Sequence, residues 1–356
     1  EHAGARAGLK ELLENPSAGR EAVEVLSRLY YSREEFADLA KIAEFRLAVV
    51  EDPIRRVRVL RETAGLQEKH VGDKNAALGY LRRAMGLEPQ NLNIEDEVVR
   101  LATDTDDWET AVHAYREAIA SLGSENQERG VELRLKMAAL LENRLDRLGE
   151  ALASYRAALG HEPGNLVAAR GAVRTGGAEA DWQAVVSAFI SVTRAHQRLD
   201  TEMLDTIEQR ANETGAYAGL AKVMAPQLLT LAEALPEITA ELEARLANWF
   251  IEQCSDDDSG RLALRRSLAL QPGHVSRLEQ LAAIERATPN HDLLGTLLAL
   301  AGQRGDHFDE LYEAAGLARQ LLGDTPQTRE IFTGLLNRSA ALWNRGVQPA
   351  GARDNA

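Results

Sequence analysis

Two acidic runs and one glycine-rich stretch contain residue types that could serve chemistry. The run Asp306-His307-Phe308-Asp309 combines the imidazole and carboxylate groups that bind metal ions. The run Asp256-Asp257-Asp258-Ser259 could bind calcium, but it lacks the spaced ligands and distal glutamate of a calcium loop. Acidic residues are also favoured at helix N-termini, where the helix dipole is positive. We therefore interpret the first run as a helix start and the second as a solvated turn between helices.

The glycine-rich stretch comprises Gly171 and the pair Gly176-Gly177. No strand is predicted before it, so we interpret it as a break before a helix beginning at Asp181 rather than as a phosphate-binding loop. The sequence contains no phosphate loop, zinc-protease motif or nucleophile elbow. No pair of carboxylates stands out as a general acid and a general base. We therefore expect the protein to be no enzyme and to bind no cofactor and no metal ion.

The elements that would position functional residues follow from composition. Hydrophobic residues make up 45% of the 356 residues and aromatic residues only 5%. Alanine, leucine, glutamate and arginine dominate, which favours helices. Long alternating runs of strand-forming residues are absent from the sequence, so an all-α fold is predicted. Cys254 is the single cysteine, which rules out an internal disulfide, and its apolar neighbours predict a buried structural thiol rather than a reactive one.

Charge and hydropathy narrow the environment and the partner. The net charge of −14 disfavours generic nucleic-acid binding, because phosphate backbones are repelled. No segment approaches the roughly 18 apolar residues that a membrane span needs, and no signal peptide is visible. We therefore expect a cytoplasmic protein without membrane insertion. The chain begins at Glu1 without an initiator methionine, which we interpret as an excised piece of a longer protein.

A tandem repeat is visible at one fixed offset along the chain, the offset that takes Pro89 to Pro163. The same offset relates Trp108 to Trp182. It also relates further pairs, namely Val57 and Val131, Ala64 and Ala138, Glu68 and Glu142, Ala77 and Ala151, and Asn91 and Asn165. Matches spread over a long stretch at one offset indicate repeated structural units.

The repeat predicts how the chain is organised. The interval from Pro163 to Pro272 is longer than the repeat offset, and the excess leaves room for one extra helical hairpin within 201–236. We predict one domain over 1–347, with copies at about 16–89, 90–163, 164–272 and 273–340, and a polar tail at 348–356. Asn15-Pro16 and Phe36 suggest that the first copy is degenerate, and the last copy lacks its proline.

Each copy is expected to consist of helical hairpins. Apolar residues follow helical spacing, while Gly72 ends one helix and Asp73 can cap the next. Pro89 stops the second helix and Asn91 can cap the following one. Short connections make adjacent helices antiparallel, and stacked hairpins bury apolar faces that one hairpin cannot bury alone. Trp108 and Trp182 are interpreted as spacers between successive hairpins.

These residues resemble the tetratricopeptide repeat. When Pro89 is placed at motif position 32, Ala64, Gly65, Ala77 and Ala84 occupy positions 7, 8, 20 and 27. Position 11 is glutamate, at Glu68 and Glu142, where the family prefers tyrosine. The Trp108 and Tyr115 spacing is also similar to half-a-TPR units. The resemblance implies a right-handed α-α superhelix of about 18–20 antiparallel helices with a concave groove that binds a peptide or partner helix.

The resemblance also implies which residues line that groove, namely those of the first helix of each hairpin. In the first unit they are Val59, Glu62, Leu66, Lys69 and His70. In the second unit they are Leu133, Lys136, Leu140, Asn143 and Arg144. We expect Lys69, His70 and the second set to bind a partner, because their mixture of cationic and apolar side chains suits an acidic-apolar peptide. Ordinary solvated helix charge is the competing interpretation.

Three functions remain open from the sequence. The leading hypothesis is a non-catalytic protein-interaction scaffold of unknown protein or peptide partner, acting as one arm of a larger bacterial assembly. The second is an RNA-binding α-solenoid, suggested by the tryptophan and tyrosine spacing but disfavoured by the acidic charge. The third is a regulatory or recruiting region of a larger multidomain enzyme, suggested by the start at Glu1. The oligomeric state is not predicted.

Overall fold

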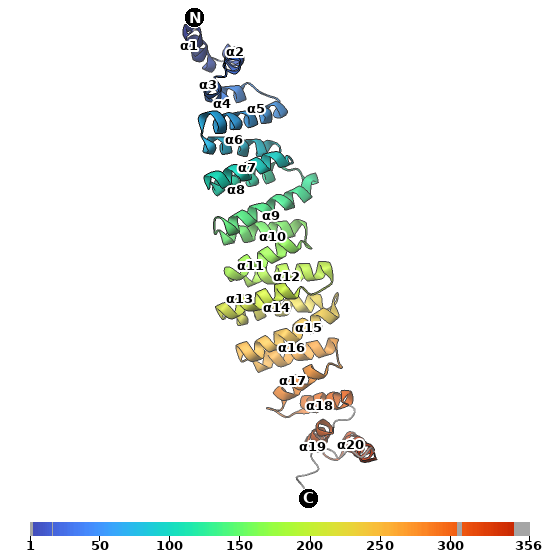
Figure 1. The fold of residues 1–356 in the computed structure, drawn as a ribbon. Helices are drawn as coiled ribbons and strands as arrows, with labels where there is room; N and C mark the ends of the chain where they lie inside the picture. The colour runs from blue at the N-terminus through green and yellow to red at the C-terminus, as the bar shows by residue number, and fades with distance from the viewer. Residues whose placement is uncertain (1–2, 16, 305–307, 345–356) are drawn as a thin grey trace. The chain divides into compact units, whose positions relative to one another are not determined.

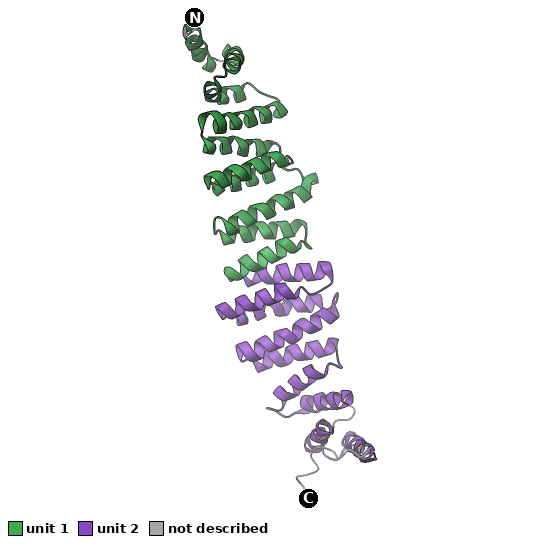
Figure 2. Cartoon of the chain, in the orientation of Figure 1, with its two compact units in different colours: residues 1–179 green, residues 180–356 purple. Residues whose placement is uncertain are grey.

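The computed structural model describes residues 3–15, 17–304 and 308–344 of the chain. Within these ranges all regular structure is helical, with twenty α-helices joined by short turns (Figure 1). The predicted all-α fold class of tetratricopeptide-like helical hairpins is confirmed. The chain divides into two compact units, unit 1 with residues 1–179 and unit 2 with residues 180–356 (Figure 2).

Unit 1 contains helices α1 to α11. Their bounds are α1 (Ala3–Glu11), α2 (Gly19–Ser32), α3 (Phe36–Lys41), α4 (Ala43–Ala48), α5 (Pro53–Leu66), α6 (Lys74–Leu87), α7 (Leu92–Thr105), α8 (Trp108–Ser121), α9 (Gln127–Asn143), α10 (Leu148–His161) and α11 (Leu166–Ala178). A π-helical turn at Gln67–Val71 extends α5. We refer to α2, α5, α7, α9 and α11 as the first helices of their hairpins.

Unit 2 contains helices α12 to α20. Their bounds are α12 (Trp182–His196), α13 (Thr201–Thr214), α14 (Tyr217–Leu231), α15 (Pro236–Asn248), α16 (Asp257–Leu270), α17 (Val275–Glu285), α18 (His291–Gln303), α19 (Asp309–Leu322) and α20 (Pro326–Asn344). A second π-helical turn, at Trp249–Gln253, extends α15. Cys254 follows this turn and is half-buried rather than buried, because it lies in the connection between two helices.

The turns inside the hairpins between α2 and α16 share a recurring backbone conformation. One residue per turn adopts a left-handed conformation with φ between 53° and 81°, and an N-cap position follows it directly. These residues are Glu34, Gly72, Asp106, Asp146, Ala180, Gly215 and Ser255. The interval from Gly72 to Asp106 is shorter than the interval from Asp106 to Asp146. The sequence repeat is therefore a shorter hairpin followed by a longer one.

Helix starts are fixed by the caps that the sequence predicts. The carboxylate of Asp73 accepts the backbone N–H of Ala76 at 2.8 Å, and Asp107 and Asp181 cap α8 and α12 in the same way. Asn91 caps α7. Each cap satisfies a backbone donor that the helix leaves unpaired, a contribution of about 1 kcal/mol.

The core of unit 1 lies where alanines let helices approach closely. Ala77 and Ala84 of α6 and Ala111 of α8 are fully buried. Trp108 is 7% exposed and its indole N–H donates to Asp106 at 2.8 Å. Trp182 is equally buried in unit 2, so both tryptophans fill internal space as expected of spacers.

The glycine-rich stretch is a correction to the sequence analysis. Gly171, Gly176 and Gly177 do not break the chain but lie inside α11, and all three are buried. A Cβ atom at Gly171 would overlap the ring of Tyr155, which occupies the space that a side chain would need. Close packing of a ring on the helix backbone therefore explains this glycine.

The predicted domain and copy boundaries remain predictions. The division between the two units follows Glu179, inside the predicted third copy, and the structure places α13 and α14 within the predicted insertion at 201–236. Pro16 and the predicted tail at 348–356 lie outside the described residues.

Candidate functional site

A cleft of about 550 Å³ opens in unit 1 between the first helices α5 and α7. We call it the α5–α7 cleft. Val57, Leu81 and Leu101 belong to its lining but are almost fully buried, so its exposed apolar surface comes from Ile54, which is 66% exposed. The charged residues of the lining are Arg58, Arg61, Glu62, Glu68, Lys69, Glu88, Glu97 and Arg100. A mainly charged lining with one exposed apolar side chain suits a peptide more than a small apolar ligand.

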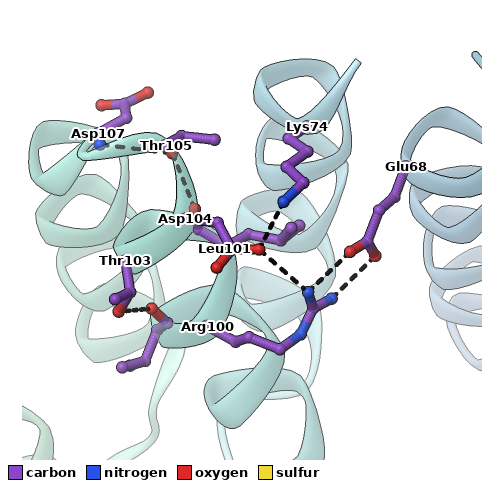
Figure 3. A network of polar contacts seen from close by, with 9 residues as sticks. Glu68, Lys74, Arg100, Leu101, Thr103, Asp104, Thr105 and Asp107 are labelled. Carbon is purple, nitrogen blue, oxygen red and sulfur yellow. Dashed lines mark hydrogen bonds and ion pairs between the residues drawn. The ribbon is translucent and has the colours of Figure 1, made fainter. Parts of the chain in front are cut away.

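Ion pairs between successive first helices hold half of these charged residues. Arg100 of α7 binds Glu68 through two hydrogen bonds of 2.7 and 2.8 Å (Figure 3). Arg61 donates to Glu97 at 3.1 Å. The hydrogen bonds from Arg100 hold the pKa of Glu68 below its usual value, so the carboxylate stays ionised at neutral pH. Bidentate geometry makes such a pair well directed.

A second cation joins the same network. The ammonium of Lys74 donates to Asp104 at 2.7 Å, and Asp104 also lies 3.7 Å from Arg100 (Figure 3). This hydrogen bond from Lys74 lowers the pKa of Asp104. The network joins the end of α5 to α7 and the start of α6, and so fixes the positions of the helices on both sides of the cleft.

Two cations of the cleft remain available to a partner. Arg58 and Lys69 are exposed, and neither forms an ion pair within the described part of the chain. Glu62, by contrast, is held by Arg46 at 2.7 Å. Arg58 and Lys69 therefore provide positive charge at the cleft that no carboxylate of the described residues neutralises through direct contact.

The structure brings only part of the predicted first-unit set to this cleft. Glu62 and Lys69 line it, but Leu66 is buried in the core and Val59 faces the opposite side of α5. His70 packs against the ring of Phe36, with 4.3 Å between ring centroids. The cleft-lining face of α5 lies one residue earlier in the chain than the family positions imply, at Arg58, Arg61, Gly65 and Glu68.

Lys136 of the second unit belongs to a buried ion cluster. Its ammonium donates to Glu95 at 2.7 Å and to Glu132 at 2.8 Å. Glu95, only 4% exposed, also binds Arg129 at 2.6 Å and accepts the hydroxyl of Tyr115 at 2.9 Å. Burial raises the pKa of Glu95, but the hydrogen bonds from Lys136, Arg129 and Tyr115 outweigh it and lower that pKa. Lys136 therefore helps to neutralise a buried carboxylate.

The other predicted residues of α9 are also occupied by internal contacts. Leu133 is fully buried in the core, and Leu140 is half-buried against it. Asn143 is exposed, and its amide donates to the carbonyl of Ala139 at 2.9 Å. Arg144 lies over the ring of Trp108 at 4.7 Å from the centroid. The structure therefore does not gather the second-unit set around one opening, and a fully buried Leu133 is not accessible to a partner.

The contacts of His70 and Arg144 follow one rule. The aromatic residue two positions after the left-handed turn residue packs against the end of the following hairpin's first helix. Phe36 contacts His70 and Trp108 contacts Arg144 in unit 1, and Tyr217 contacts Trp249 at 6.0 Å in unit 2. His70, Arg144 and Trp249 therefore each cover an aromatic ring of the preceding hairpin, which is a structural role.

A recurring ion pair was missed by the sequence analysis. Arg174 of α11 binds Glu142 at 2.8 and 2.9 Å, and both residues lie one repeat offset after the Arg100 and Glu68 pair. Tyr155 also donates to Glu142. The sequence signal was present, since arginine recurs at the same offset as glutamate. The ion pair with arginine explains why position 11 holds glutamate rather than tyrosine.

The acidic runs contribute no metal site to the described residues. No group of three or more histidine, cysteine, aspartate or glutamate side chains there is arranged to hold a metal ion. Asp256 accepts the N–H of Ser259 at 3.0 Å and caps α16. Asp306 and His307 lie outside the described residues. Among the described helices, none is long and apolar enough to cross a membrane.

Comparisons with known proteins add likeness of architecture only. No protein-family model and no curated protein matches the chain. A chain in the crystal structure of the APC/C hetero-tetramer Cut9-Hcn1 is similar at 12% identity and a TM-score of 0.24, covering 95% of this chain. This chain spans 60% of that one. The P58(IPK) TPR domain is similar at 14% identity and a TM-score of 0.21, covering 92% of this chain and 99% of that domain. Neither likeness bears on function.

Proposed function

We propose that this chain is a non-catalytic protein-interaction scaffold, and that its α5–α7 cleft binds an extended acidic-apolar segment of a partner protein. One observation carries the proposal: Arg58 and Lys69 line a cleft together with the exposed Ile54 and have no ion-pair partner in the described residues. The sequence analysis had named Lys69 among the partner-binding residues. His70, Leu133, Lys136, Leu140, Asn143 and Arg144 are left out of the proposed contact because internal packing engages them.

The free energy of binding should be most favourable for a segment that carries carboxylates as well as an apolar side chain. Covering the exposed side chain of Ile54 would contribute about 1–2 kcal/mol. Carboxylates of the segment placed against Arg58 and against Lys69 would gain charge-assisted hydrogen bonds, because no carboxylate of the described residues forms an ion pair with either cation. The clamped pairs Glu68–Arg100 and Arg61–Glu97 hold the walls in place, so little ordering of the scaffold is required on binding.

The RNA-binding alternative is less well supported by this cleft. Its lining contains no aromatic residue on which a base could stack, and four carboxylates stand beside its four cations. A recruiting region of a larger enzyme would bind its partner through the same cleft. That role differs from the scaffold role only in the presence of a catalytic domain on the same protein.

Charge reversal at the cleft tests the proposal. Peptides selected from a random display library against the full chain are expected to be rich in Asp, Glu and aliphatic residues. The double variant Arg58→Glu/Lys69→Glu should weaken their binding at least tenfold in calorimetry, because each substitution places a carboxylate against the ligand's own.

A matched control separates the cleft from overall charge. The double variant Arg156→Glu/Lys222→Glu makes the same change of net charge at two exposed positions outside the cleft. Its affinity should stay within twofold of the unmodified chain. Equal weakening in both variants, or a library that yields no enriched sequence, would contradict the proposal.

A further inference from the structure

A second cleft of unit 1 lies on the other side of α5, against α2. This α2–α5 cleft encloses about 520 Å³. Its cations are all arginines, namely Arg20, Arg28, Arg46 and Arg55. Its anions are Glu24, Glu51 and Asp52, and the apolar lining consists of Val23, Val49, Val50 and Val59. Four guanidinium groups at one opening are a local exception in a chain of net charge −14.

Two of these arginines are only loosely paired. Arg28 approaches Glu24 at 3.7 Å and Arg55 approaches Asp52 at 3.9 Å, and the arginine side chains are 82% and 79% exposed. The carboxylate of Asp52 is already engaged, because it accepts the backbone N–H of Arg55 at 3.0 Å and caps α5. Exposed pairs at such distances contribute little, so Arg28 and Arg55 keep donors for an incoming anion.

The other two arginines already form closer contacts. Arg46 is 12% exposed, and its Nη2 donates to Glu62 of the neighbouring cleft at 2.7 Å. Its Nη1 is buried and has no hydrogen-bond partner among the described residues. Arg20 donates to Glu51 at 3.0 Å and to the carbonyl of Val49 at 3.3 Å. Arg46 therefore provides a fixed positive charge, to which the exposed side chains of Arg20, Arg28 and Arg55 can add hydrogen-bond donors.

We propose that the α2–α5 cleft recognises a phosphorylated side chain on the partner segment. A phosphate monoester carries nearly two charges and three acceptor oxygens, whereas a carboxylate carries one charge and two oxygens. Several guanidinium forks match the larger anion. The half-buried valines of the lining favour phosphothreonine, whose methyl group can lie against Val49 and Val59. The proposal rests on the proposed function, since both clefts are lined by α5 and one segment crossing that helix can reach both.

The direct test uses the full chain and small probes that need no identified partner. The probes are N-acetyl-phosphothreonine methylamide, N-acetyl-glutamate methylamide and inorganic phosphate. Binding is followed through the guanidinium NMR signals of Arg28 and Arg55. The phosphothreonine derivative should shift both signals saturably, with a Kd at least tenfold lower than that of the glutamate derivative. Inorganic phosphate should compete with it.

Paired variants locate the binding. Arg28→Gln/Arg55→Gln should raise the Kd of the phosphothreonine derivative at least tenfold. Both side chains are exposed, so the fold should persist, which thermal unfolding checks. Arg33→Gln/Arg156→Gln removes the same charge at exposed positions outside the cleft and should change the Kd less than twofold.

The outcomes separate this proposal from the proposed function. Absence of saturable binding, equal binding of the glutamate derivative, or equal weakening in the Arg33 and Arg156 control would overturn phosphate recognition. None of these results touches the α5–α7 cleft. Conversely, Arg58→Glu/Lys69→Glu should abolish peptide binding and leave the arginine signals responsive to the phosphothreonine derivative, so either proposal can fail alone.

Discussion

Single residues in this chain are fixed mainly by what packs against them from the next hairpin. Glu68 and Glu142 stand where the resembled family has tyrosine, and each binds an arginine about one hairpin further along. The sequence shows the glutamates and arginines at matching offsets, but not their contact. The contact depends on how far successive first helices are rotated and separated, which only packing decides.

Substitution of Gly171 tests directly whether a single residue is fixed by what packs against it. Gly171→Ala is expected to lower the free energy of unfolding by about 1–2 kcal/mol, because the new methyl group would overlap the ring of Tyr155 and overpacking outweighs the helix propensity of alanine. Urea unfolding of the full chain measures the change.

The control for that variant lies in α6. Gly79 is also inside a helix, yet a Cβ atom there would meet nothing within 4 Å. Gly79→Ala should therefore stabilise the chain by up to about 1 kcal/mol through helix propensity alone. A stabilising Gly171→Ala would show that the tyrosine ring does not require the glycine.

At the scale of elements, the hairpin turn is the most regular feature of the chain. Its left-handed residue and the N-cap after it follow from local chemistry, which is why Gly72 and Asp73 were recognisable in the sequence. At other turns the left-handed position holds Asp106, Asp146 or Ala180, which carry no glycine signal. Those turns were located through their caps or through the repeat offset.

Ala180 should therefore be a strained position. It is exposed and adopts φ of 56°, a conformation that costs a residue with a Cβ atom about 1–2 kcal/mol. Ala180→Gly should raise the free energy of unfolding by about 0.5–1 kcal/mol, after allowing for the extra freedom of glycine in the unfolded chain. The reverse change, Gly215→Ala, should destabilise by a similar amount in the same urea assay. An Ala180→Gly variant less stable than the parent would refute the assignment of strain.

At the scale of the whole molecule, the two units bury carboxylates with opposite electrostatics. Glu95 of unit 1 has a lowered pKa because Lys136, Arg129 and Tyr115 stabilise its charged form against the cost of burial. Glu243 of unit 2 is 1% exposed and binds Arg266 at 2.7 and 2.9 Å, but burial dominates and raises its pKa. The ionised form is therefore favoured by folding in one case and disfavoured in the other.

The pH dependence of the free energy of unfolding should reveal this difference between Glu95 and Glu243. The contribution of Glu95 is present above its unfolded pKa of about 4.3 and is lost as pH falls through the lower folded pKa. Glu95→Gln should cost about 3 kcal/mol at pH 7, since it leaves Arg129 buried with one partner fewer, and clearly less at pH 3.5.

Glu243→Gln should show the opposite trend. Its folded pKa lies above the unfolded value, so its favourable contribution is complete below the unfolded pKa and is lost as pH rises through the folded pKa. The destabilisation by Glu243→Gln should therefore be smaller at pH 7 than at pH 3.5. Denaturant titrations of the full-length variants across this pH range test both signs, and parallel pH profiles for the two variants would contradict the assignment.

The sequence by itself determined the helical class, the hairpin period and several helix caps, because these depend on composition, spacing and contacts within a few residues. The tertiary structure alone decided which side of α5 lines the α5–α7 cleft. Neighbouring residues on a helix differ in direction by about 100°, so an alignment correct to one residue can still name the wrong face. Packing against α2 and α7 turned Arg58 and Arg61 to the cleft and Leu66 into the core, and it joined Lys136 to Glu95.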